Sequence, residues 1–180
     1  MIAGRRIRGA AKYAVLMILL QFGQSNYIRD YEDISKFYSQ DARVETLYTT
    51  MGPGECKVDK VTKAYGVNVQ FTRHFHSKHT LHLMGHFVNH RHRWYSVELD
   101  TMDVKKKDGS YYSTERLLHI FANGNCGIFS ITRNWGGRGN QYELRVKNGY
   151  NGYGKCYSRF ELDTKRAGVF KKIKPCKNKR

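Results

Sequence analysis

Two residues of opposite charge stand two positions apart in a short segment near the end of the chain. The segment 141–147 reads QYELRVK, so Glu143 and Arg145 alternate with aromatic or apolar residues. This alternation predicts a β-strand with Glu143 and Arg145 on one face. If that face lines a cavity, Glu143 can bind an ammonium group, and Arg145 can bind a carboxylate through two hydrogen bonds. If the face meets solvent, both residues are ordinary surface charges.

The two charges also act on each other. Both can face a cavity and neutralise each other, because a lone buried charge is costly. An ammonium ion bound to Glu143 would lie close to Arg145. Two like charges about 6 Å apart repel by roughly 2 to 3 kcal/mol at an effective dielectric constant of about 20. This repulsion predicts weak binding of an amine and favours a neutral or anionic ligand.

Histidines are concentrated in the middle of the chain. Side chains two positions apart on a strand share a face, a spacing that permits a transition-metal site. The chain has no CxxC pair, however, and the histidine spacing implies no single coordination geometry. We therefore predict solvated strand histidines and no metal site. The residues concerned are His74, His76, His79, His82, His86, His90 and His92.

No enzyme motif is present in the sequence. It has no GxSxG, HExxH, Walker or GxGxxG pattern. The glycine-rich segment 135–139, WGGRG, predicts a turn, because no helical pattern follows it as in a phosphate-binding loop. The sequence therefore predicts a binding protein without catalytic residues or a cofactor.

Eight segments with the alternation of β-strands position these residues. Short turns such as 52–54, 107–109 and 123–125 separate several of them. Consecutive strands with short connections predict an all-β fold, an eight-stranded antiparallel up-and-down barrel that can hold one small ligand. Helical spacing predicts one short helix within 27–40 and another within 157–165. The expected strands are 42–50, 55–63, 66–76, 79–88, 94–101, 113–122, 126–132 and 141–147. A last extended piece is expected at Val169 and Phe170.

The N-terminal segment has the pattern of a secretory signal peptide. Four basic residues precede the apolar stretch 13–22, which is too short to span a bilayer. We predict a signal peptide over 1–25, cleaved near Ser25, and a single domain over 26–180. Secretion permits disulfides. The four cysteines, Cys56, Cys126, Cys156 and Cys176, predict two bridges, and their spacing leaves all three connectivities open.

The chain is strongly basic, with a formal net charge of +17. Such a surface favours acidic partners. The C-terminal segment 171–180 is rich in lysine and is either a solvated chain end or the site of a contact with a glycosaminoglycan. We expect no nucleic-acid partner, no membrane partner after signal cleavage, and a monomer.

Taken together, these features resemble the tick salivary lipocalins, the histamine-binding protein family of the lipocalin superfamily. The resemblance covers the whole chain after the signal peptide. It is carried by residues 45–50 (ETLYTT) followed by Cys56, and by Cys126, residues 142–144 (YEL), Cys156 and Cys176. It implies the bridges Cys56–Cys176 and Cys126–Cys156.

The resemblance also implies a function. Such proteins are secreted into tick saliva and sequester host mediators, which suppresses host defence. The ligand it implies is a biogenic amine such as histamine or serotonin, and the alternative is a leukotriene-like or sterol lipid. Amine-binding members have an acid after the cysteine that corresponds to Cys126 and an aromatic residue after the Glu-Leu pair. This chain keeps Glu143 and has Gly127 and Arg145 at the other two positions.

Overall fold

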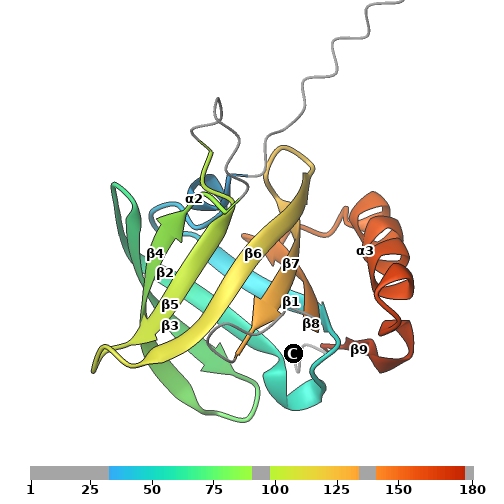
Figure 1. Ribbon diagram of the computed structural model, residues 1–180, viewed down its shortest axis with the longest axis horizontal. Helices are drawn as coiled ribbons and strands as arrows, with labels where there is room; N and C mark the ends of the chain where they lie inside the picture. Colours follow the sequence, from blue (N-terminus) through green and yellow to red (C-terminus); the bar gives the residue numbers. More distant parts are fainter. Residues whose placement is uncertain (1–32, 91–97, 134–140, 177–180) are drawn as a thin grey trace, which may run out of the picture.

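Eight consecutive antiparallel strands close into a barrel (Figure 1). The computed structural model describes residues 33–90, 98–133 and 141–176. The sheet runs in chain order from β2 to β8 and then to β1, and β1 pairs back onto β2. The predicted all-β barrel is confirmed. Its strands are β1 (Arg43–Thr49), β2 (Lys57–Tyr65), β3 (Asn68–Phe75), β4 (Thr80–Val88), β5 (Thr101–Lys106), β6 (Tyr111–Phe121), β7 (Cys126–Thr132) and β8 (Gln141–Lys147).

One predicted strand is wrong. The sequence alternation suggested a strand over 94–101, whereas β5 begins at Thr101 and continues to Lys106. Residues 98–100 are not strand, and 91–97 lie outside the described part. Pairing decides the position of β5, because Met102 stands opposite Phe87 of β4 and Glu115 of β6. Because β5 ends in lysines, the alternation of apolar residues does not indicate a strand there.

One end of the barrel is closed by the short helix α2 (Ile34–Phe37), which lies at the upper end in Figure 1. Asp33 caps this helix by accepting a hydrogen bond from the Ser35 backbone N–H at 3.0 Å. Ile34 and Phe37 are fully buried in the main core. α2 is the only helical part of 27–40 within the described residues, and the predicted signal peptide 1–25 and the predicted turn 135–139 lie outside them.

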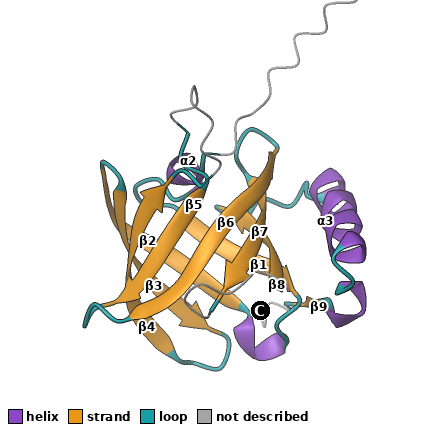
Figure 2. Cartoon of the chain, viewed as in Figure 1, coloured by secondary structure: helices purple, strands orange, loops and turns teal. Residues whose placement is uncertain are grey.

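A second core lies outside the barrel, under helix α3 (Gly154–Arg166), which runs along one side (Figure 2). Outward residues of β7 and β8 pack against the buried Phe160 of this helix. The helix is longer than the predicted 157–165. Val169 and Phe170 do not form the predicted extended piece: a 3-10 helix, η2, spans Phe170–Lys172. The short strand β9 (Lys174–Pro175) then pairs with β1.

Two disulfides join the barrel to these outer elements. Cys56 is paired with Cys176, and Cys126 with Cys156, as the resemblance implies. The first bridge holds the chain after β9 against the start of β2. The second joins β7 to α3. No helix within the described ranges is long and apolar enough to cross a bilayer.

Candidate ligand-binding site

Six charged side chains lie inside the barrel as one group, which we call the ionic layer. Their side chains are at most 2% exposed. Three are acids and three are bases, so the formal charges cancel. They are Lys57 and Asp59 from β2, Arg73 from β3, Glu115 from β6, and Glu143 and Arg145 from β8.

Arg73 lies at the centre of one half of the layer. It stands directly opposite Asp59 in the β2–β3 ladder. Its Nε and Nη2 each donate to Asp59 at 2.7 Å, and its Nη1 donates to Glu115 at 2.8 Å. Such bidentate guanidinium–carboxylate contacts hold both groups in a fixed orientation. Ser113 donates a further hydrogen bond to Glu115 at 3.0 Å.

Arg145 joins this half of the layer to the other. Its guanidinium is paired with Glu115 and with Glu143, to which its Nε donates at 2.7 Å. The remaining oxygen of Glu143 accepts a hydrogen bond from Lys57. Tyr38, at the end of α2, accepts a hydrogen bond from Arg145 at 2.6 Å and donates one to Asp59 at 2.8 Å. The contacts therefore close into one network.

Burial and pairing have opposite effects on the acids of this network. Burial alone would raise the pKa of Glu143, but Arg145 and then Lys57 outweigh it and hold the pKa below its usual value. Glu115 behaves in the same way, with Arg145 and Arg73 keeping its pKa well below its usual range. Both carboxyl groups are therefore ionised at neutral pH.

Lys57 differs from the two arginines of the layer. Burial lowers its pKa from 10.5 to about 8, and Glu143 offsets only part of that effect. An ammonium group in this position is thus the charge in the layer that is most easily lost as the pH rises.

The structure brings together the two predicted site residues and adds four others. Glu143 and Arg145 share an inward face, as the period of two predicts, and they neutralise each other in part. Sequence reasoning did not find Lys57, Asp59, Arg73 or Glu115. Lys57 and Asp59 give a weak signal, because they alternate with Val58 in KVDKV at 57–61, whereas Arg73 and Glu115 have polar neighbours on both sides and give none. That pattern is equally typical of an exposed strand face.

Gly127, at the position of the second acid in the amine-binding pattern, lies in the apolar core. A Cβ atom there would be only 2.9–3.1 Å from side-chain atoms of Phe129, Leu117 and Phe37. An acidic side chain has no space at this position without a shift of these neighbours. The packing of α2 onto β7 therefore excludes a second carboxylate beside Gly127.

A hollow of about 400 Å³ opens at the end of the barrel opposite α2, next to the ionic layer. We call it the mouth. Phe75, Leu81 and Tyr112 supply its apolar and aromatic walls, and Lys106 and Glu55 supply charges at its edge. The lining residues are completed by Gly54, Ser77 and His79.

Two contacts connect the mouth to the rest of the barrel end. Arg133 is paired with Glu55 and places its guanidinium 4.4 Å from the centre of the Tyr112 ring. Lys57 of the ionic layer lies 3.5 Å from the backbone carbonyl oxygen of Glu55. The floor of the mouth is therefore adjacent to the Lys57–Glu143 pair.

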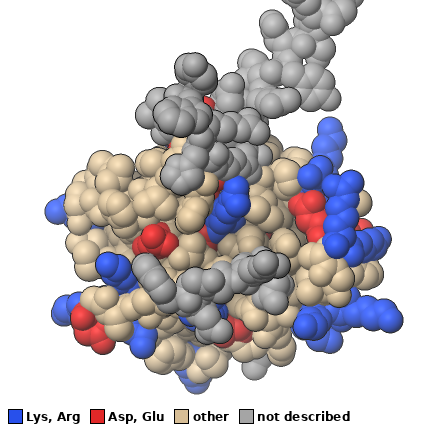
Figure 3. Space-filling view, viewed as in Figure 1, with Lys and Arg blue, Asp and Glu red and all other residues tan. Residues whose placement is uncertain are grey.

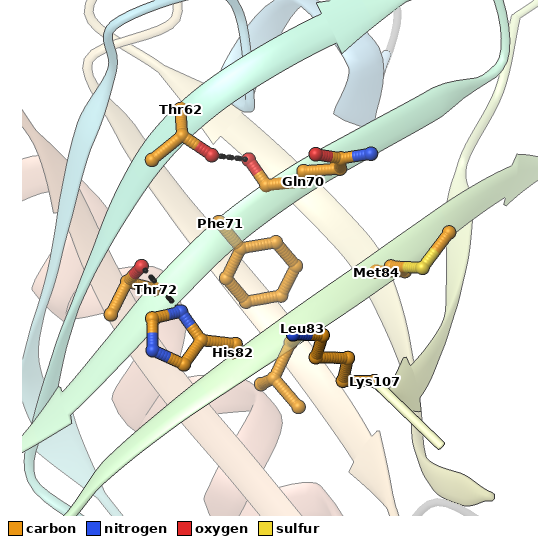
Figure 4. A pocket seen from close by; sticks show the side chains of 8 residues that line it. All are labelled: Thr62, Gln70, Phe71, Thr72, His82, Leu83, Met84 and Lys107. Carbon is orange, nitrogen blue, oxygen red and sulfur yellow. Dashed lines mark hydrogen bonds between the residues drawn. The ribbon is translucent and has the colours of Figure 1, made fainter. Parts of the chain in front are cut away.

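A second hollow, of about 440 Å³, lies on the outer face of the barrel (Figure 4). Thr62, Thr72, His82 and Met84 line it, with Lys107 at one side. Phe71 and Leu83 also border it, although both are buried residues of the main core. This hollow opens to solvent and does not reach the ionic layer.

Of the predicted strand histidines in the described part, only His74, His82 and His86 lie on strands, and the others lie between β3 and β4 or after β4. The histidines on strands make hydrogen bonds with the neighbouring strand, such as His74 with Thr80 at 3.2 Å and His86 with Asn68 at 3.0 Å. Among the described residues, no three His, Cys, Asp or Glu side chains come together as metal ligands. His92 lies outside those residues.

Comparison with solved structures identifies the fold. Lobster apocrustacyanin A1 superposes on this chain with a TM-score of 0.50 at 11% identity, over 78% of this chain and 77% of that one. The chain has the lipocalin fold. A cockroach allergen, Per a 4, covers 80% of the chain with a TM-score of 0.49 at 16% identity, and 87% of its own length is matched. The bovine lipocalin allergen Bos d 2 covers 74% with a TM-score of 0.46 at 10% identity, and 89% of its own length is matched.

The similarity concerns the fold alone at these identities. No protein-family model matches the sequence, and a search of curated proteins finds no match. The lipocalin fold agrees with the superfamily that the sequence resembles. The narrower resemblance to the tick salivary proteins stays a prediction.

Proposed function

We propose that this chain is a secreted, non-enzymatic protein that binds a small ligand at the mouth of its lipocalin barrel. The observation that carries the proposal is the hollow of about 400 Å³ beside the ionic layer. Concave sites with mostly apolar walls and a few charged groups are typical of small-molecule binding. Two disulfides are consistent with an extracellular location. The biological role that the resemblance suggests is sequestration of a host mediator, which would suppress host defence.

The charges favour a lipid carboxylate over an amine as the ligand. An amine would use Glu143 as its counter-ion, but both oxygens of this carboxylate already face cations, Lys57 and Arg145. A fatty-acid-derived ligand instead places its chain against Phe75 and Leu81, and its carboxylate near Lys106. A sterol fits the same walls without using the lysine.

Calorimetry with a leukotriene-like fatty acid and with histamine tests this choice. We expect the fatty acid to bind, and Lys106→Met to weaken it about fivefold, which corresponds to about 1 kcal/mol for a partly solvated charged contact. Lys105→Met is the matched control, because Lys105 is an exposed neighbour on the same strand that does not line the mouth. Tight histamine binding that is lost in Glu143→Gln would instead support the amine assignment.

A second candidate function is binding of a sulfated glycosaminoglycan through the C-terminal basic segment. Lys and Arg side chains gather over α3 in Figure 3. Between Gly154 and Pro175 the acids are Glu161 and Asp163, and Asp163 is already paired with Arg159. The exposed bases of this segment are Lys155, Lys165, Arg166, Lys171, Lys172 and Lys174.

The salt dependence of binding distinguishes ligand binding in the mouth from glycosaminoglycan binding at the surface. Binding of a polyanion to exposed charges falls steeply as salt is added, whereas binding in the mouth changes little. We expect elution from heparin at higher salt for the wild type than for a Lys171→Glu/Lys172→Glu variant, with fatty-acid affinity equal in both. Equal elution of the two proteins would remove this candidate.

A further inference from the structure

Lys57 occupies a distinctive position in the ionic layer. Each arginine of the layer contacts two acids: Arg73 contacts Asp59 and Glu115, and Arg145 contacts Glu115 and Glu143. Lys57 is paired with Glu143, and its other polar contact is a backbone carbonyl oxygen. Its ammonium group is therefore the most weakly connected cation of the six-residue layer.

Removal of Lys57 would leave every acid of the layer with a guanidinium partner. Asp59 keeps Arg73, and Glu143 keeps Arg145 on one of its two oxygens. Glu115 is unaffected, because it contacts both arginines. The layer would then carry one net negative charge, with one oxygen of Glu143 lacking its cation. A site of this kind binds a small cation, because an uncompensated buried charge is unfavourable.

The vacated position would also lie next to the mouth. The Lys57 ammonium lies 3.5 Å from the carbonyl oxygen of Glu55, which lines the mouth. The side chain itself runs from β2 toward Glu143 on β8. Beyond Cβ its three methylenes and ammonium match propylammonium atom for atom. A primary alkylammonium ion of that length is thus the cation that fits the space.

We propose that Lys57 is a built-in counter-ion that fills the cation position of Glu143, so that the barrel interior rejects small amines. Without the Lys57 side chain, the same position binds a primary alkylammonium ion. This role of Lys57 makes the proposed function more specific, because it states which ligands the barrel rejects. It rests on the proposed function in one respect, since it assumes that the barrel binds ligands. Lys57 is then a specificity-determining residue, which selects against the ligand class that Glu143 alone would attract.

Rescue of a Lys57→Ala variant by propylammonium tests the inference. Melting temperatures are measured in propylammonium chloride and in sodium chloride at equal ionic strength. We expect a rise of about 5 °C for the variant at saturating propylammonium, since ligands that bind the folded state stabilise it. We expect no such rise for the wild type, where Lys57 fills the site. 1-Propanol, which has no charge, should not rescue the variant.

Two matched variants test separately whether the response needs the Glu143 carboxylate and whether it needs the space left by the Lys57 side chain. Lys57→Met fills the space without charge, and Lys57→Ala/Glu143→Gln keeps the space without the carboxylate, so neither should respond to propylammonium. Equal responses of the single and double variants would overturn the inference. So would a folded Lys57→Ala that does not respond. A Lys57→Ala chain that does not fold in either salt would also count against it, because the remaining ion pairs should hold the layer.

The outcome is independent of the natural ligand. Propylammonium rescue uses a probe that the mouth need not bind, whereas fatty-acid titration tests the mouth directly. Rescue without binding of either a fatty acid or a sterol would refute the proposed function and leave the role of Lys57 intact. Fatty-acid binding without rescue would support the proposed function and refute the role of Lys57.

Discussion

Replacing Arg73 by methionine should be strongly destabilising. Arg73 is fully buried and donates hydrogen bonds to two carboxylates, Asp59 at 2.7 Å and Glu115 at 2.8 Å. Methionine has a similar length but no charge, so the variant has an ionic layer with one net negative charge. Asp59 keeps only its hydrogen bond from Tyr38, and Glu115 keeps Arg145. The substitution therefore leaves Asp59 as an ionised acid without a cationic partner.

Removal of one partner from a buried ion pair costs about 3 to 5 kcal/mol. Each acid keeps at least one contact, so we expect a loss of folding free energy within this range. For a domain of this size the loss corresponds to a fall in the melting temperature of roughly 6 to 20 °C. Urea unfolding followed by circular dichroism measures the free energy directly.

Arg159→Met is the matched control. Arg159 is paired with Asp163 one helical turn away at 3.1 Å, but its side chain is 37% exposed. Such exposed pairs contribute at most about 0.5 kcal/mol. If Arg73→Met costs no more than Arg159→Met, the ionic layer is not an interdependent buried network, and our reasoning about its role is wrong.

Three further outcomes are expected. The Cys56→Ala/Cys176→Ala variant should lose on the order of 4 to 5 kcal/mol in urea unfolding, because that bridge closes a sequence separation of 120 residues; an unchanged midpoint would contradict this. Phe160→Ala should cost about 3 to 5 kcal/mol because Phe160 is fully buried under α3, whereas Leu162→Ala, at an exposed site, should cost less than about 0.5 kcal/mol. The stability of the wild type relative to Lys57→Met should rise by roughly 2 kcal/mol from pH 8 to 10, because the lowered pKa of Lys57 makes the unfolded wild-type chain bind more protons than the folded one in this window. The tyrosines that titrate in the same window are common to both proteins, so parallel pH profiles of the two would refute this prediction.

Much of the fold follows from local sequence pattern. The alternation of residues places β7 and β8 at the bounds that the structure has, and it finds β1 to β4 and β6 to within a few residues, but it misplaces β5. The sequence pattern does not locate β5, because the position of this strand is set by its pairing with β4 and β6 and not by its own apolar residues. The short extent of α2 in the described residues likewise depends on its burial at the end of the barrel.

The candidate site, like the fold, follows in part from the sequence and in part from the tertiary structure. The period of two along β8 determines that Glu143 and Arg145 share a face, and this needs no other part of the chain. Only the closure of the barrel decides that this face looks inward and meets Lys57 and Glu115, which come from other strands. Registers between strands are set by the whole sheet, and a shift of one residue would turn each of these side chains outward. For that reason the sequence by itself predicts two facing charges, and the tertiary structure alone decides that they belong to a neutral layer of six.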